Sequence, residues 1–211
     1  MTDSDRRKVN QEKCSWCLGD SEYERYHDTE WGVPQKDDRI LFEKISLEGF
    51  QAGLSWITIL RKRDNFRKSF DNFDIEKVGE YTDEHTEKLL QNAKIVRHRG
   101  KIESVINNSK RAIELQNEFG SLAAFFWSFE PKEKITFSET SGSETPIPAS
   151  TVESLALSKA LKSRGWTFVG PTICYSFMQS MGIVNDHVNG CYRKEIITGL
   201  RNKFKRPETD F

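Results

Sequence analysis

The 211-residue sequence contains no long apolar run. A membrane-spanning helix needs about 18 consecutive apolar residues, and no window of the chain approaches that length. The opening residues, MTDSDRRKVNQEK, also lack the apolar stretch of a secretory signal. We therefore expect a cytoplasmic protein with no membrane partner.

An excess of charge of one sign is also missing. Lys and Arg together number 32, and so do Asp and Glu. This balance excludes a uniformly basic surface, so a nucleic-acid partner has to be recognised from local charge. Hydrophobic residues at 36% and charged residues at 30% predict a folded domain and exclude intrinsic disorder of the whole chain.

The chain is shorter than the roughly 250 to 300 residues at which single cores begin to divide. We expect one domain over residues 14–192, with two helical lobes and a hairpin at about 82–116. A mobile N-terminal tail over 1–13 and a basic C-terminal tail over 193–211 would flank it, and about the last fifteen residues are polar enough to be mobile. The Ser-, Thr-, Pro- and Glu-rich stretch at 130–150 is typical of a surface connection within the fold.

Alternating apolar patterns are scarce, whereas apolar residues recur at spacings of three and four. This periodicity predicts an all-α fold. The expected helices cover residues 38–50, 54–63, 74–80, 82–92, 98–116, 121–129 and 171–182. Ser150 and Glu153 form the sequence pattern of a capping box, which predicts the start of one more helix that Gly165 can close.

Metal-binding residue types stand near both ends of the chain. Cys14 and His27 lie near the start, while His187 and Cys191 have the i, i+4 spacing that places two ligands on one helical turn. Two thiolates and two imidazoles complete a tetrahedral zinc site, and a site with no open position has a structural role. Cys14-Ser-Trp-Cys17 is itself a C-x-x-C pair, so Cys17 in place of His27 stays an alternative, as do thiols and imidazoles that bind nothing.

Positive charge is concentrated between residues 94 and 111. Six cations oppose only Glu103 in this segment: Lys94, Arg97, Arg99, Lys101, Lys110 and Arg111. The sequence LLQNAKIVRHRGKIESVI predicts a helix, a tight turn and a second helix, and the amides and cations of such a turn suit a DNA phosphate. A second basic cluster, RKRDNFRK at 61–68, could contact the same strand, and an ordinary solvated face is the alternative.

Aromatic residues are dense near the start of the chain, where they include Trp16, Tyr23, Tyr26, Trp31 and Trp56. Glu48 stands among them at the end of an apolar helix, and glutamate is seldom buried unless it is paired or functional. Gly49 and Gly53, around Gln51 and Leu54, predict a tight turn that can approach a ligand closely. Aromatic faces with one carboxylate suit a flat cationic heterocycle; the alternatives are core packing for the rings and a helix-end charge for Glu48.

Five long motifs stand out: YHDTEWGVP, LEGFQAGLSWITIL, IVRHRGKI, LSKALKSRG and FVGPTICYSFMQSMGIVNDHVNGC. Together they resemble the bacterial DNA-3-methyladenine glycosylase I family, from Cys14 to about Cys191 without a large gap. The resemblance implies an all-α helix-hairpin-helix DNA glycosylase fold with a structural zinc that joins the N- and C-terminal segments. It also implies alkylated double-stranded DNA as the partner and free 3-methyladenine as the product. We expect a monomer.

The resemblance further implies roles for individual residues. The family's zinc ligands fall on Cys14, His27, His187 and Cys191. Glu48 and Tyr26 match residues that hydrogen-bond the excised base, and Trp56 matches the one that stacks on it. Positions lining the base pocket fall on Trp16, Tyr23, Trp31 and Ser176. The loop that enters the duplex falls on Gln51, Gly53 and Leu54. Lys94 departs from the family, which usually has a glycine there, and Cys17 is not a family ligand.

Methylation at N3 gives adenine a positive charge, so the base can leave without being protonated. The catalytic aspartate of the wider superfamily is not evident, because the available Asp186 precedes the proposed ligand His187. We therefore predict a monofunctional glycosylase that flips out the damaged base, excises it with water and has no lyase activity. A non-catalytic zinc-containing DNA-binding protein would not need Glu48, and a zinc hydrolase would need an open metal position.

Overall fold

The computed structural model describes residues 12–132 and 147–208, and within these ranges it contains helices and no strands. Two short 3-10 helices are η2 (Ser15–Cys17) and η3 (Asp71–Phe73). The α-helices are α1 (Ser21–Thr29), α2 (Asp38–Gln51), α3 (Trp56–Ser69), α4 (Ile75–Gly79), α5 (Asp83–Gln91), α6 (Arg99–Phe119), α7 (Leu122–Trp127), α8 (Val152–Ser163), α9 (Pro171–Ser180) and α10 (Arg193–Lys203). The predicted all-α fold is confirmed. Helices α1 and α10 were not predicted. No helix of the described residues is long and apolar enough to cross a membrane.

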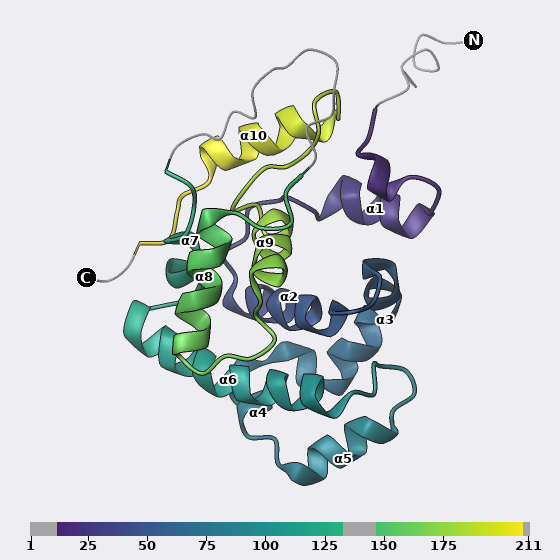
Figure 1. Ribbon diagram of the computed structural model, residues 1–211, viewed down its shortest axis with the longest axis vertical. Helices are drawn as coiled ribbons and strands as arrows, with labels where there is room; N and C mark the ends of the chain where they lie inside the picture. The colour runs from purple at the N-terminus through teal and green to yellow at the C-terminus, as the bar shows by residue number, and fades with distance from the viewer. Residues whose placement is uncertain (1–11, 133–146, 209–211) are drawn as a thin grey trace.

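Helix α2 lies at the centre of the molecule and packs against α3, α6, α7 and α9 (Figure 1). Its residues from Leu41 to Phe50 are all buried, although Glu43, Lys44, Ser46 and Glu48 among them are polar or charged. The first turn is anchored by Asp38, whose carboxylate accepts hydrogen bonds from the backbone of Leu122 and Ala123 at the start of α7, both at 2.9 Å. Gln116 of α6 donates to the same carboxylate at 2.7 Å. One side chain therefore fixes three helices relative to one another.

Helices α5 and α6, joined by residues 92–98, form the predicted hairpin at one end of the molecule (Figure 1). Thr82 and His85 form a capping box at the start of α5, and the His98 side chain accepts from the backbone N–H of Lys101 at the start of α6. Lys94 lies in the turn with a backbone that is not left-handed, so the lysine that replaces the usual glycine is accommodated without backbone strain.

The start of α8 differs from the predicted capping box. Thr151 is the N-cap and Ser154 is its partner, so the cap lies one residue later than Ser150 and Glu153 suggested. Gly165 ends the helix with a left-handed φ of +79°, as predicted. The boundary was misplaced because Thr151, which follows Ser150 directly, is also a residue type that caps helices.

The predicted basic tail over 193–211 begins with a helix that was not expected from the sequence. Residues Arg193–Lys203 form α10, which buries Ile197. Arg201 and Arg206 both pair with Glu130, at 2.6 and 2.8 Å. The sequence could not show this, because the carboxylate that holds the two arginines lies some 70 residues away in a polar stretch.

Helices α1 and α10 both lie at one end of the molecule (Figure 1), and the segments that precede them in the chain are in contact there. The backbone N–H of Tyr192 donates to the carbonyl of Glu12 at 3.0 Å, and Lys13 pairs with Glu24 and Asp28. Glu12 and Lys13, which fall within the predicted N-terminal tail, therefore contact the folded domain. The rest of that tail, residues 1–11, and most of the predicted surface connection, residues 133–146, lie outside the described residues.

Candidate functional site

A cluster of thiols and imidazoles lies between α1 and the segment that precedes α10. Cys14, His27 and Cys191 are buried, and one ligand atom from each lies within 4.8 Å of the others. The closest pair is the Cys191 Sγ and His27 Nε2 atoms, at 3.4 Å. These three residue types at these separations can hold a metal ion.

His187 lies beside this cluster but outside the group of three. Its ring centroid is 5.1 Å from that of His27, and its Nε2 atom is buried without a hydrogen-bond partner among the described residues. A buried ring nitrogen with no partner is costly, and a metal ion would satisfy it. Gly32, which has a left-handed φ, lies so close that a Cβ there would be 2.9 Å from the His187 ring.

The other nitrogen of each histidine is held by an oxygen. His27 Nδ1 lies 2.8 Å from an Asp28 carboxylate oxygen, and His187 Nδ1 lies 2.9 Å from the Asn185 side-chain oxygen. An oxygen acceptor at Nδ1 places the proton there and leaves the Nε2 lone pair free for a metal. Both imidazoles therefore have the tautomer that ligation requires. The sequence analysis did not single out Asp28 and Asn185, although each lies within two residues of its histidine.

Cys17 belongs to a different set of contacts. Its thiol donates to the backbone carbonyl of Cys14 at 3.1 Å, and it is not part of the three-residue cluster. The structure therefore favours His27 over Cys17 as the second donor at the N-terminal end. Burial raises the pKa of the Cys14 thiol to about 12 and lowers that of His187 to about 3. A cation at the cluster would instead lower the pKa of the Cys14 thiol, because it stabilises the thiolate.

The predicted aromatic residues come together into one wall. Trp16 lies at its centre, with ring centroids 5.4 Å from Tyr23, 6.4 Å from Tyr26 and 5.1 Å from Trp31. Tyr26 lies 5.6 Å from Trp56 on α3. The ring centroid of Trp31 also lies 4.5 Å from that of His187, so the aromatic residues adjoin the cluster of thiols and imidazoles.

Glu48 is buried beside this wall and is only 4% exposed, which removes the alternative of an exposed helix-end charge. Burial raises the pKa of its carboxyl, and the Lys44 ammonium at 3.3 Å opposes that effect. Lys44 donates to the Tyr26 hydroxyl and lies 3.6 Å above the centroid of the Trp56 ring. The indole N–H of Trp56 is buried without a partner among the described residues, so the cluster retains one unused donor.

Lys44 was not among the site residues predicted from the sequence. The signal was present, because Lys44 precedes Glu48 by four residues, the spacing at which side chains meet on one face of a helix. A lysine inside an apolar helical run is also unusual enough to suggest a paired charge.

The turn after α2 has the shape predicted for a loop that approaches a ligand. Gly53 has a left-handed φ of +77°, and Leu54 is a 41% exposed apolar side chain beside it. Lys101 does not lie on the surface: its ammonium is buried and donates to the carbonyls of Phe50 and Ala52, at 2.9 and 2.5 Å. The structure therefore corrects the role expected of Lys101, which ties this loop to α6 and is not placed to bind a phosphate.

The remaining basic residues of the hairpin differ in how they are paired. Arg97 is exposed and has no ion pair within the described residues, whereas Arg99 pairs with both Glu87 and Glu103. Glu87 comes from α5, outside the segment over which charge was counted in the sequence. The second basic cluster does adjoin the hairpin, because Lys94 lines one surface hollow together with Thr58, Arg61, Lys62 and Asn65 of α3.

Neither Ser176 nor Asp186 makes a hydrogen bond or ion pair with Glu48 or Lys44 within the described residues. Ser176 lies on α9, which packs on α2, but its hydroxyl makes no hydrogen bond within the described residues. Asp186 is used structurally, because its carboxylate accepts from the Tyr175 hydroxyl at 2.6 Å and from the Gln179 amide at 2.9 Å. These bonds agree with the expectation that Asp186 is not a free catalytic carboxylate.

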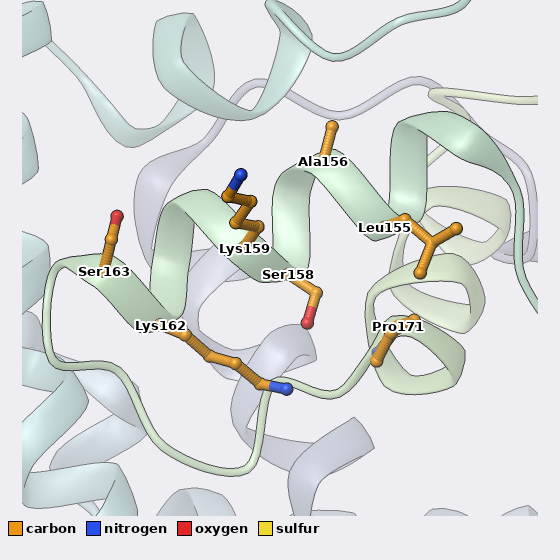
Figure 2. A pocket seen from close by; sticks show the side chains of 7 residues that line it. All are labelled: Leu155, Ala156, Ser158, Lys159, Lys162, Ser163 and Pro171. Atoms are coloured by element: carbon orange, nitrogen blue, oxygen red, sulfur yellow. The ribbon is translucent and has the colours of Figure 1, made fainter.

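Another hollow lies along α8 and the first residue of α9 (Figure 2). It is lined by Leu155, Ala156, Ser158, Lys159, Lys162, Ser163 and Pro171. None of the predicted site residues is among them, so this hollow is separate from the Glu48 cluster.

Comparison with known proteins identifies the family. Residues 16–194 match the methyladenine glycosylase family. The chain is 52% identical over 180 residues to DNA-3-methyladenine glycosylase 1 of Escherichia coli strain K12. The aligned region covers 85% of this chain and 95% of the relative. A solved 3-methyladenine DNA glycosylase I in complex with 3-methyladenine has a TM-score of 0.79 and 31% identity, covering 86% of this chain and 97% of that one. The enzyme from Staphylococcus aureus has a TM-score of 0.77 and 30% identity, covering 87% and 97%.

This all-helical fold is therefore that of a 3-methyladenine DNA glycosylase I. The chain itself belongs to the methyladenine glycosylase family. The predicted family and the prediction of an N-glycosylase enzyme are both confirmed.

Proposed function

We propose that this protein is a monofunctional DNA glycosylase of base excision repair in the bacterial cytoplasm. It flips 3-methyladenine out of alkylated duplex DNA, hydrolyses the glycosidic bond and leaves an abasic site. The observation that carries the proposal is Glu48, a buried carboxylate that pairs with Lys44, whose ammonium in turn contacts Tyr26 and Trp56. A buried negative charge beside aromatic faces suits a flat cation, and 3-methyladenine within DNA is one.

The reaction does not require the protein to act as a general acid. The methylated base already carries a positive charge, so it departs as a neutral molecule when the glycosidic electron pair moves onto it. Positive charge then develops on the sugar, where water attacks and loses a proton. Glu48 would hold the cationic base and Trp56 would stack on its plane, with Tyr26 as a hydrogen-bonding partner. Trp16, Tyr23, Trp31 and Ser176 complete the proposed pocket.

We propose that Cys14, His27, His187 and Cys191 hold one structural zinc ion. The three-residue cluster, the unpartnered Nε2 of His187 and the oxygens that orient both imidazoles support this ligand set. With all four positions taken by protein, the metal would fix the ends of the chain and take no part in bond cleavage.

The proposed DNA surface consists of the hairpin and the loop after α2. Arg97 and Arg99 with the hollow at Lys94 would meet phosphates, while Gln51, Gly53 and Leu54 would enter the duplex where the base has left. An exposed leucine on a left-handed turn suits this second role, because an apolar wedge can replace the lost stacking. We expect the protein to act as a monomer.

The decisive experiment is release of free 3-methyladenine from methylated duplex DNA, measured by chromatography with and without EDTA. The proposal expects release in both conditions and an intact abasic strand. A protein that binds the DNA but releases no base would be a non-catalytic DNA-binding protein. Release that stops at once on adding EDTA, with the fold intact, would instead point to a zinc hydrolase.

A further inference from the structure

Lys44 places a cation inside the pocket that is proposed to receive a cationic base. Its ammonium lies 3.6 Å above the Trp56 ring centroid, 4.7 Å from that of Tyr26 and 3.3 Å from the Glu48 carboxylate. It also donates to the Tyr26 hydroxyl. These are the three residues proposed to hold the base, and each makes with Lys44 the kind of contact that it would make with the base.

The pocket is filled as well as charged. Lys44, Glu48, Tyr26 and Trp56 are 6%, 4%, 4% and 9% exposed, so a base cannot reach Glu48 while the lysine side chain stays where it is. The ammonium has to move before any base enters. Burial favours this exchange, because it lowers the pKa of Lys44 to about 8 against the opposing effect of Glu48.

Charge decides which molecules can make the exchange. When the ammonium leaves, the Glu48 carboxylate would be buried without a counterion, and an unpaired buried charge is strongly unfavourable. A cationic base supplies the missing positive charge. A neutral base does not, so its entry leaves the carboxylate unpaired. The nearby ion pair of Arg63 and Glu30, at 2.5 Å, is already satisfied and offers no replacement.

We propose that Lys44 is a specificity-determining residue whose ammonium is the exchangeable counterion of Glu48. It fills the pocket of the free enzyme, gives way to a cationic base, and returns when cleavage makes that base neutral. The inference rests on the proposed function of the pocket. It adds a reason why undamaged neutral bases are excluded and why the neutral product is expelled.

The test compares binding of free 3-methyladenine, followed by tryptophan fluorescence, in the parental protein, Lys44→Met and Lys44→Arg. The methionine variant keeps an unbranched chain without charge, and its Glu48 can protonate, so we expect it to bind the neutral product roughly tenfold tighter or more. The arginine variant keeps the charge and should bind no more tightly than the parental protein. Product inhibition of excision should strengthen in Lys44→Met by the same factor. The control, Lys77→Met, changes an exposed lysine on α4 and should alter neither quantity.

A second measurement follows Lys44 directly. Labelling with an amine-reactive reagent and mass spectrometry should find Lys44 protected in the free enzyme and reactive when 3-methyladenine saturates the pocket, with Lys77 reactive throughout. Equal or weaker product binding in folded Lys44→Met, or continued protection of Lys44 in the complex, would overturn the inference. Failure of the parental protein to release 3-methyladenine from DNA would instead overturn the proposed function itself.

Discussion

The His27 Nε2 atom lies 3.4 Å from the Cys191 Sγ atom, although 164 positions separate the two residues in the sequence. The contact joins α1 to the segment before α10. Because the loop that it closes is nearly as long as the chain, a metal ion at this point would remove much conformational freedom from the unfolded state. The zinc proposal is therefore primarily a prediction about stability.

We expect one zinc ion per chain and a lower thermal unfolding temperature when Cys191 is changed to Ser or when zinc is removed by a chelator. Elemental analysis and thermal denaturation are the measurements. Cys17→Ser is the matched control, because this neighbouring buried thiol only donates to the Cys14 carbonyl and should leave the zinc content unchanged. Freshly purified protein without zinc, or loss of zinc in Cys17→Ser but not in Cys191→Ser, would contradict the ligand set.

Glu48→Gln should slow the excision of 3-methyladenine in single-turnover experiments. It keeps the size of the side chain but removes the charge, and a hydrogen bond to a charged group contributes about 1.5 to 3 kcal/mol, or a rate loss of about tenfold or more. Glu43→Gln is the control, since Glu43 is a buried carboxylate of the same helix that pairs with Arg67 and not with the pocket. Parental rates in folded Glu48→Gln would place the base elsewhere.

Arg97→Ala should weaken binding to duplex DNA about equally for all sequences. It should also reduce the slope of log affinity against log salt concentration by roughly one unit, the value for one lost phosphate contact. Arg99→Ala should have a smaller effect, because Glu87 and Glu103 already balance much of its charge. Affinity measured at several salt concentrations gives both slopes. A larger loss for Arg99 than for Arg97 would show that its ion pairs break on DNA.

Lys101→Met should reduce excision while leaving the salt dependence of DNA binding unchanged. The buried ammonium holds the carbonyls of Phe50 and Ala52, so its loss leaves two buried acceptors unpaired and loosens the loop that carries Leu54. The measurement combines single-turnover excision with the salt series used for Arg97. A fall in the salt slope would mean that Lys101 contacts phosphate directly.

Asp38→Ala should lower the free energy of unfolding by about 2 to 4 kcal/mol, because three hydrogen bonds to one carboxylate are lost between α2, α6 and α7. Asp37→Ala is the control. The Asp37 side chain accepts only from the backbone of Ile40 at the start of α2, so its loss should cost about 1 kcal/mol. Denaturant unfolding measures both, and equal costs would show that Asp38 acts only as a local cap.

The helical class, most helix positions and the family could be predicted from the amino-acid sequence alone. These features are local: a spacing of three and four, a capping residue or a long motif is visible wherever the chain folds. The C-cap at Gly165 was predicted correctly for the same reason, because it depends on one residue and its neighbours. The structure also brings the predicted Cys14, His27 and Cys191 into one cluster.

Which charged side chains are buried, and which groups they contact, depends on the tertiary structure. Lys101 and Arg99 look alike in sequence, yet one ammonium is buried under a loop and the other side chain is an exposed ion pair. Glu130 pairs with Arg201 of α10 and with Arg206 after it, two residues more than 70 positions away in the sequence. The burial of Lys44 could not be predicted from the sequence, because Tyr26 of α1 and Trp56 of α3 surround it only in the folded protein. Desolvation and counterion contacts depend on elements that are distant in sequence.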